Sequence, residues 1–499
     1  MWRDQRQRTA GAGGRLRLGW VRILSRTALA WLLLVFASCL LAQNAPLSGD
    51  HPWHAVEEQT IEADARNSLD TRFHVDPAKT YSLAELVDLA EAHNPETRFA
   101  WERARAQAAA LGIAQSELYP TLAAAALSET GRDQAFFGNR FYGQSTGGLQ
   151  VALALTYDVF DFGARSGRIS TARAEVLVAN FAFNDAHRNV IFQVEQAYYR
   201  LLNALGQEDA ARASLANAQT VEQAADERLA DGLATLPDVL EARSARAQAE
   251  YDLATVVGAE EIARGDLATA VGTSATAPIH TQSLEQVPTL ESIGDTVEQA
   301  IARALEKRPD LLQQVAEIRS ADARVKEARA AYYPQLNLDV NPAAQSLYGI
   351  QSPYPWVNTA TWTGTVRLTL QWTVFDGGAR KNQLAQARAN VNASQAQADV
   401  VRNQIVDEVW TAYSNLHTAF RQRQAALALL EAASQSYNAA LESYNYGVRS
   451  LLDVTAAQRA LAQARSADVL ARTQVLTSLA DLAFRTADSI QANRGRPHP

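Results

Sequence analysis

Residues 361–375 alternate between apolar and polar side chains along one unbroken run. Trp362, Val366 and Leu370 belong to one set of alternate positions, and threonines fill most of the other set. Because successive side chains of a strand point to opposite faces, the run predicts a strand with an apolar face and a hydroxyl-rich face. A tilted membrane strand needs roughly 9–11 residues. The run therefore predicts a strand that crosses a bilayer.

A strand-to-helix junction of nearly the same sequence occurs twice in the chain. Val159–Arg165 reads VFDFGAR, and Val374–Arg380 reads VFDGGAR at a distance of 215 positions. A long segment typical of helix follows each junction, and a Tyr-Pro pair precedes each predicted hairpin, at Tyr119 and Tyr333. A nearly constant offset over this length indicates an internal structural duplication.

Each half is predicted to contain a short helix, a hairpin of two strands, one long helix and a return helix. The first repeat is expected at 81–277, with strands at about 121–128 and 149–159, a long helix at about 163–230 and a return helix at about 236–271. The second repeat is expected at 291–487, with strands at about 335–341 and 361–375, a long helix at about 379–446 and a return helix at about 451–487. An extended leader at 43–80, a linker at 278–290 and a disordered tail at 488–499 complete the prediction.

The N-terminal segment 1–42 has the pattern of an export signal. An arginine-rich stretch ends at Arg26, and the apolar stretch Thr27–Ala42 that follows is shorter than a typical spanning helix. A membrane anchor is the alternative. The only cysteine, Cys39, follows small residues as in a bacterial lipobox. In that case Cys39 would be a lipidation site and would carry palmitate. Cleavage after Ala42 by an ordinary signal peptidase remains equally open.

The net charge of −8 hides a split between this segment and the rest of the chain. Positions 1–42 hold seven arginines and one aspartate, so the remaining residues are strongly acidic. An acidic body has no electrostatic reason to bind nucleic acid. No phosphate loop or zinc-protease helix is present, and the G-x-S-x-G sequence at Gly143–Gly147 lacks the strand-to-helix context of a hydrolase. We therefore expect no enzyme, no cofactor and no metal site.

The predicted strands do not suffice for a closed wall. Two hairpins give four strands, and open strand edges are not tolerated in lipid because unpaired backbone groups are costly there. Barrels of a single chain need at least about eight strands. The chain must therefore close its wall with copies of itself, and two copies or three copies would meet the requirement.

The paired repeats, the Tyr-Pro-x-Leu sequences, the Phe-Asp-x-Gly-x-Arg junctions and the turn Gly447–Val454 resemble the TolC/OprM family of outer-membrane efflux channels over about residues 80–487. The resemblance implies a mixed α and β membrane protein with four strands per chain. It implies a homotrimer whose twelve-stranded β-barrel, in the outer membrane of a Gram-negative bacterium, continues as an antiparallel α-helical barrel in the periplasm. It further implies a passive duct for drugs, ions or exported molecules, which a periplasmic adaptor (a membrane fusion protein) joins to an inner-membrane pump of the RND, ABC or MFS type.

In such channels the periplasmic helix turns close the pore like an iris. The resemblance places Tyr444, Arg449 and Asp453 at the positions that tie the helix ends together and line the constriction. An arginine and a carboxylate on adjoining turns can latch helices, and inward carboxylates favour cations. Helix capping and ordinary packing are the alternative roles for these residues.

The sequence departs from the family pattern at Ala456, where a second acidic residue is expected. Asp238 and Glu241 of the first repeat are candidates to supply the missing charge. A second class of function is an elongated periplasmic coiled-coil scaffold or adaptor without a barrel. The strand at 361–374 argues against it, because a soluble scaffold has no use for two tryptophans on an apolar strand face.

Overall fold

The computed structural model of the protein describes residues 58–68, 73, 75–287, 296–351 and 355–488. The chain divides into two units, Met1–Arg72 and Phe73–Pro499. Of the first unit the structure describes helix α2 (Glu58–Ser68), so part of the segment expected to be an extended leader is helical. The expected export signal and Cys39 lie outside the described residues, as does the tail beyond Asp488.

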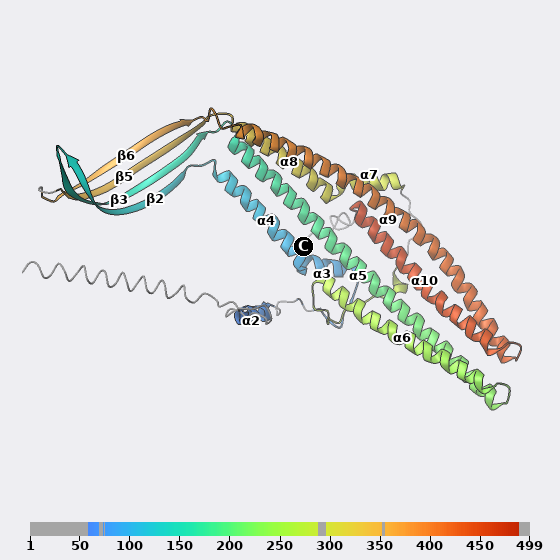
Figure 1. Ribbon diagram of the computed structural model, residues 1–499. Helices are drawn as coiled ribbons and strands as arrows, with labels where there is room; N and C mark the ends of the chain where they lie inside the picture. The colour runs from blue at the N-terminus through green and yellow to red at the C-terminus, as the bar shows by residue number, and fades with distance from the viewer. Residues whose placement is uncertain (1–57, 69–72, 74, 288–295, 352–354, 489–499) are drawn as a thin grey trace, which may run out of the picture. The chain divides into compact units, whose positions relative to one another are not determined.

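The second unit contains a four-stranded antiparallel sheet with the order β2-β3-β5-β6 (Figure 1). The strands are β2 (Thr121–Phe137), β3 (Arg140–Phe160), β5 (Gln335–Gln351) and β6 (Val357–Gln371). Three of the four are much longer than the sequence indicated. Residues 129–148, a Gly- and Phe-rich segment expected to be a loop, pair in register from Glu129 with Gly148 to Phe137 with Arg140. Pairing with a partner strand therefore outweighs the local preference for a loop.

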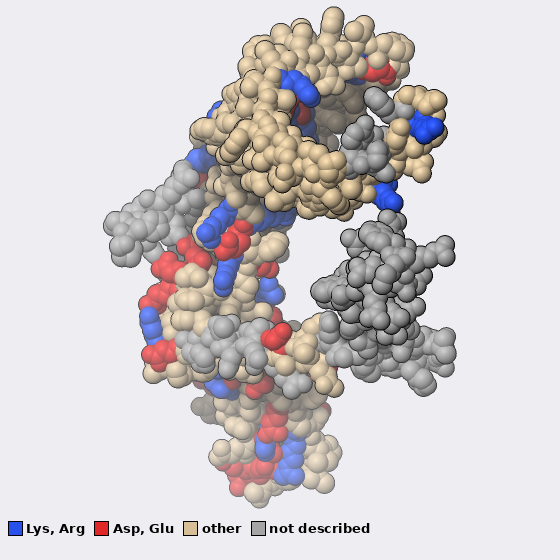
Figure 2. All heavy atoms as spheres, turned by 90° about the vertical axis from the view of Figure 1, so that its left-hand side faces the viewer, with Lys and Arg blue, Asp and Glu red and all other residues tan. Residues whose placement is uncertain are grey.

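Register divides the side chains of the sheet between two faces. Leu122, Leu155, Val340 and Val366 lie directly opposite one another along one row and share the apolar face. The neighbouring row, on the other face, is Thr121, Thr156, Asp339 and Arg367. On the apolar face, the Trp362 side chain is 82 % exposed in a single chain. Figure 2 shows few charged side chains over the strands and many along the helices.

The helices of the second unit repeat in pairs of equal length. They are α3 (Leu83–His93), α4 (Pro95–Ser116), α5 (Ala164–Ala230) and α6 (Leu236–Val271) in the first half, and α7 (Val297–Lys307), α8 (Pro309–Ala330), α9 (Ala379–Asn445) and α10 (Leu451–Thr486) in the second half. Helices α5 and α9 have 67 residues each, which is a length of about 100 Å. The equal lengths and the four strands confirm the predicted duplication. None of the described helices has an apolar stretch long enough to cross a bilayer.

The repeated junction motif turns the chain from strand into helix. Gly163 and Gly378 precede the long helices with φ of 98° and 90°, a left-handed conformation that glycine adopts without strain. The carboxylate of Asp376 accepts hydrogen bonds from the backbone N–H groups of Gly378 and Arg380, both at 3.0 Å. Asp161 plays the same role in the first half, where the backbone N–H of Gly163 donates to its Oδ1 at 3.1 Å. The aspartate thus satisfies N–H groups that a helix start leaves free.

Each long helix has shorter helices packed along it. Helices α4 and α6 pack along α5, and helices α8 and α10 pack along α9 (Figure 1). Helices α8 and α10 also contact α5, so the two halves share one body. A short parallel pairing of β1 (Thr80–Tyr81) with β4 (His280–Thr281) joins the start of the first repeat to its end.

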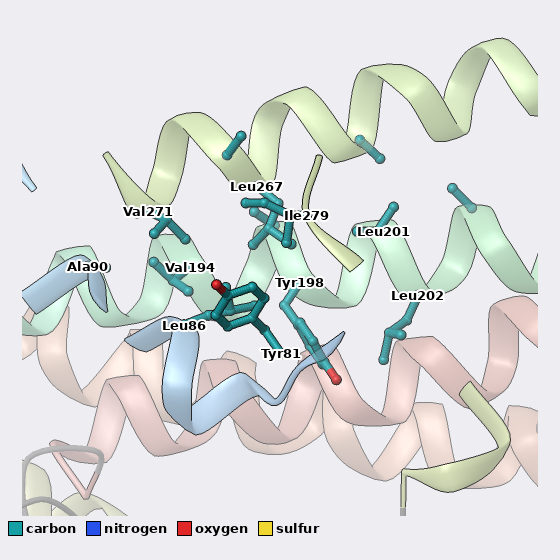
Figure 3. Packing of buried hydrophobic residues seen from close by; sticks show 14 of the residues in the cluster. Tyr81, Leu86, Ala90, Val194, Tyr198, Leu201, Leu202, Leu267, Val271 and Ile279 are labelled. Carbon is teal, nitrogen blue, oxygen red and sulfur yellow. The ribbon is translucent and has the colours of Figure 1, made fainter. Parts of the chain in front are cut away.

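The largest hydrophobic cluster surrounds the middle of α5. Figure 3 shows Val194, Tyr198 and Leu202 of that helix against Leu86 of α3 and Leu267 of α6. Each of these five side chains is almost completely buried. The cluster fixes the middle of the helical body, far from both the strands and the helix turns.

Candidate gate at the helix turns

The two long helices end in turns built on the same backbone hydrogen bonds. In the first turn, the backbone carbonyl of Arg228 accepts from the N–H groups of Leu233 and Ala234, at 2.7 and 3.1 Å. In the second turn, the carbonyl of Ser443 accepts from Val448 and Arg449, at 2.8 and 3.3 Å. Gly232 and Gly447 give both turns their positive φ, at 71° and 76°. The duplicated sequence therefore places two equivalent turns at the end of the helical body.

Asp238 and Asp453 occupy equivalent places just after these turns and cap the return helices. Asp238 Oδ2 accepts hydrogen bonds from the Thr235 N–H and Oγ1 at 2.9 and 2.7 Å. Asp453 Oδ2 accepts from the Ser450 N–H and Oγ at 3.2 and 2.9 Å. The hydrogen bonds from Ser450 lower the pKa of Asp453, and those from Thr235 lower the pKa of Asp238. Both carboxylates are therefore caps, and both are charged at neutral pH.

Tyr444 lies inside the apolar cluster between the two hairpins. Its side chain is 4 % exposed, and the cluster includes Val221 and Val239 of the first hairpin and Leu451 of the second. Its hydroxyl makes no hydrogen bond within the described residues. Burial raises the pKa of this hydroxyl. The ring therefore acts in packing, and its phenol group stays neutral.

Arg449 is exposed on the second turn, and it forms no ion pair within the described residues of one chain. It is near enough to Asp453 for its charge to contribute, behind the hydrogen bonds from Ser450, to the lowered pKa of that carboxyl. Within one chain, the arginine that ties the helix ends together is a different residue.

That residue is Arg228, in the last turn of α5, which the sequence analysis missed. Its Nη1 donates to the backbone carbonyls of Tyr444 and Asn445, at 2.8 and 3.0 Å. Its guanidinium also lies over the Tyr444 ring, 4.7 Å from the centroid. The available signal was the break in the repeat, because the equivalent position of the second half is Ser443. The contact joins residues 216 positions apart, which no local pattern reveals.

Glu241 pairs with Arg459 of α10, with Nη2 and Oε1 3.4 Å apart. The two side chains are 42 % and 67 % exposed, so the pair contributes little to stability.

Ala456 is exposed one turn away from Asp453. The described residues contain no group of three or more potential metal ligands.

A sequence profile of the outer membrane efflux protein family matches residues 86–273 and 300–487. These two matches coincide with the two structural repeats. The chain belongs to this family. The assignment confirms the resemblance drawn from the paired repeats, and it excludes the alternative of a coiled-coil scaffold without membrane strands.

Individual members of the family are similar over most of their length. Protein CyaE of Bordetella pertussis is 30 % identical over 402 residues, which cover 79 % of this chain and 82 % of CyaE. Outer membrane protein OprJ of Pseudomonas aeruginosa is 26 % identical over 461 residues, or 90 % and 93 % of the two chains. A solved membrane protein of Pseudomonas aeruginosa superposes with a TM-score of 0.71 at 26 % identity, over 81 % of this chain and 93 % of that one.

This outer membrane efflux protein is therefore a channel of tripartite efflux or secretion systems. It lies in the outer membrane of Gram-negative bacteria, and its helical part is periplasmic. The family consists of channels and not of enzymes. Its members form homotrimers that work with efflux pump complexes.

The turns of this outer membrane efflux protein expose large apolar side chains to solvent. The exposed residues are Leu233, Leu236, Leu240, Tyr446, Val448 and Leu452. Large exposed apolar patches mark interaction surfaces more often than free surface. In a single chain, the helix turns are therefore the best candidates for contact with another protein.

Proposed function

We propose that three copies of this chain close a twelve-stranded wall and that their helices prolong it as a tube through the periplasm. The observation that carries the proposal is the sheet, in which β2 and β6 each pair on one side only among the described strands. Such edges are not tolerated in lipid, and pairing β6 of one copy with β2 of the next removes them. The exposed apolar face with Trp362 would then meet the acyl chains, and the face with Thr121 and Arg367 would line the lumen.

The duct carries drugs, ions or exported molecules out of the cell. An inner-membrane pump of the RND, ABC or MFS type supplies them through a periplasmic adaptor. The exposed apolar side chains of Leu233, Tyr446 and Val448 support an adaptor contact at the helix turns. Their burial against a partner would be favourable, because apolar surface leaves water.

The helix turns form the gate of this duct, with Tyr444, Arg449 and Asp453 in the second hairpin and Asp238 and Glu241 in the first. The lowered pKa of Asp453 and of Asp238 keeps both carboxylates charged at neutral pH. Three copies would present a ring of these charges, which attracts cations and repels anions. The charge of Glu241 is offset by Arg459, so Asp238 is the better replacement for the acid missing at Ala456.

Planar-bilayer recordings with purified protein test the channel and its gate together. Asp453→Asn keeps an acceptor for Ser450 and removes the charge, so the ratio of cation to anion permeability should fall. Asp453→Lys should lower the ratio further. Glu261→Lys, a charge reversal in the C-terminal third of α6 and far from the turns, should leave the ratio unchanged. An unaltered ratio in both Asp453 variants would exclude the charge filter, and the absence of any conductance would exclude the channel.

A further inference from the structure

We propose that Arg228 is the latch that holds the second helical hairpin closed against the first. The inference rests on the proposed gate at the helix turns and names the residue that controls it. Arg228 belongs to α5, and both of its acceptors are backbone carbonyls at the end of α9. The contact therefore joins the end of one hairpin to the end of the other.

The chemistry of the contact is favourable for a cation. The last carbonyls of a helix have no partner within the helix, and they form the negative end of its dipole. Arg228 Nη1 reaches two of these carbonyls, at 2.8 and 3.0 Å, while its planar guanidinium covers the ring of Tyr444. A hydrogen bond with a charged donor is stronger than one between neutral groups. The same side chain thus satisfies the helix end and holds the buried ring.

The contact occurs at only one of the two equivalent turn positions. Arg228 fixes its own turn through its backbone carbonyl and the other hairpin through its side chain. Ser443 stands at the equivalent position of the second repeat and makes the same backbone bonds. The first hairpin therefore donates this contact to the second, and Ser443 returns no equivalent contact to the first.

The contact can also be released without a large penalty. Asn445 is exposed, so water can replace the guanidinium at its carbonyl. The other polar link between the hairpins at this end, Arg459 with Glu241, is a largely exposed ion pair and holds weakly. Breaking the contact of Arg228 is thus the decisive polar step when the second hairpin moves outward.

Single-channel recordings of the purified trimer in planar bilayers test the latch. Arg228→Met removes every donor and should raise the ratio of open to closed time at least about tenfold, the factor expected for charge-assisted hydrogen bonds. Arg228→Lys keeps the positive charge but loses the planar guanidinium with its several N–H donors. The ratio of open to closed time of this variant should lie between that of Arg228→Met and that of the wild type. Arg243→Met is the matched control, because Arg243 pairs with Glu222 and Asp226 inside the first hairpin.

Hydrogen exchange separates a latch from a general loss of stability. In Arg228→Met, amide exchange should rise in residues 441–448 of the second hairpin and stay unchanged around Leu267 in the middle of the body. Ser443→Ala should leave both regions unchanged. If Arg228→Met does not assemble, Arg228→Lys provides the same comparison.

The outcomes distinguish the latch from the channel itself. Wild-type protein without conductance would overturn the proposed duct. Wild-type protein that conducts, with Arg228→Met and Arg228→Lys gating like the wild type, would overturn the latch alone. Equal effects of Arg228→Met and Arg243→Met on the ratio of open to closed time would also overturn the latch. Loss of any positive charge at this end of the helices would then be enough to explain the change in gating.

Discussion

Replacing Arg308 with methionine should destabilise the helical body more than any exposed ion-pair variant. Arg308 is 4 % exposed and stands at the N-cap of α8. Its Nε and Nη2 donate to the two carboxylate oxygens of Asp310 at 3.0 and 2.6 Å, and its Nη1 donates to Glu408 of α9 at 2.7 Å. Arg485 of α10 also reaches Glu408, at 3.0 Å. One buried guanidinium thus fastens α8 to α9, and a shared carboxylate extends the network to α10.

The expected loss in the free energy of unfolding follows from the charged partners that Arg308→Met would leave unpaired. Removing one member of a buried ion pair costs about 3–5 kcal/mol, since the other charge remains buried without compensation. Glu408 would keep Arg485, and Asp310 would keep the N–H of Leu311 and the nearby charge of Arg188. The loss should therefore lie near the lower end of the range, at about 3 kcal/mol.

The loss in the free energy of unfolding caused by Arg308→Met should depend on pH. Burial alone would raise the pKa of Asp310 and of Glu408, but the hydrogen bonds and charge of Arg308 outweigh it and lower both values. A lowered carboxyl pKa gives stability that is present above the unfolded pKa of about 4 and is lost as pH falls through the folded pKa. The difference between wild type and Arg308→Met should accordingly shrink in acid.

Urea unfolding of the detergent-solubilised protein, at pH 7 and near pH 3, measures both effects. Arg459→Met is the control, because that side chain is 67 % exposed and its ion pair is weak. The free energy of unfolding of this variant should differ from that of the wild type by no more than about 0.5 kcal/mol. A loss below about 1 kcal/mol for Arg308→Met, or a loss of the same size at both pH values, would refute the reasoning.

Two further variants test packing and burial. Burial raises the pKa of Glu195 to about 7, so stability should decline as pH rises from about 4.5 to 7. In urea unfolding, Glu195→Gln should then raise the free energy of unfolding by up to about 3 kcal/mol at pH 8 and leave it unchanged at pH 4. The control Glu261→Gln, at an exposed position, should leave the free energy of unfolding unchanged at both pH values. A Cβ at Gly167 would lie 2.9 Å from the backbone nitrogen of Glu327, so Gly167→Ala should lower the melting temperature. Gly258→Ala, with open space around it, should gain about 1 kcal/mol.

The sequence was informative wherever a local pattern determines the structure. The junction Asp-x-Gly-x-Arg combines a capping carboxylate with a glycine of positive φ, so its two copies mark the starts of α5 and α9. Long segments without proline predict long helices, and alternation predicts a strand. The equal lengths of paired helices follow from the constant offset between the repeats.

Long-range contacts account for what the sequence did not reveal. Residues 129–148 form a Gly- and Phe-rich segment that looks like a loop, yet its two arms pair with each other as β2 and β3, and residues 144–148 also pair with β5. Arg228 looks like an ordinary basic residue near a helix end, and its role depends on α9. The sequence singled out Asp238 and Asp453 as gate residues, and that role stays a prediction. A capping carboxylate and a filter carboxylate are the same residue type, so the sequence left both roles open.

The two halves differ in the polar side chains at equivalent positions, and at one of these positions the side chain joins the halves. Arg308 at the N-cap of α8 bonds Asp310 and Glu408 of its own repeat. Its first-half counterpart Asn94 caps α4 and donates to the carbonyl of Ala270, also within its own repeat, at 2.9 Å. Arg228, in contrast to both, reaches the other repeat, while Ser443 makes only local bonds. Duplication alone would give two equal hairpins with no preference for which one moves. Divergence at position 228 makes the contact between the hairpins unequal in the two repeats, and the proposed latch depends on this asymmetry.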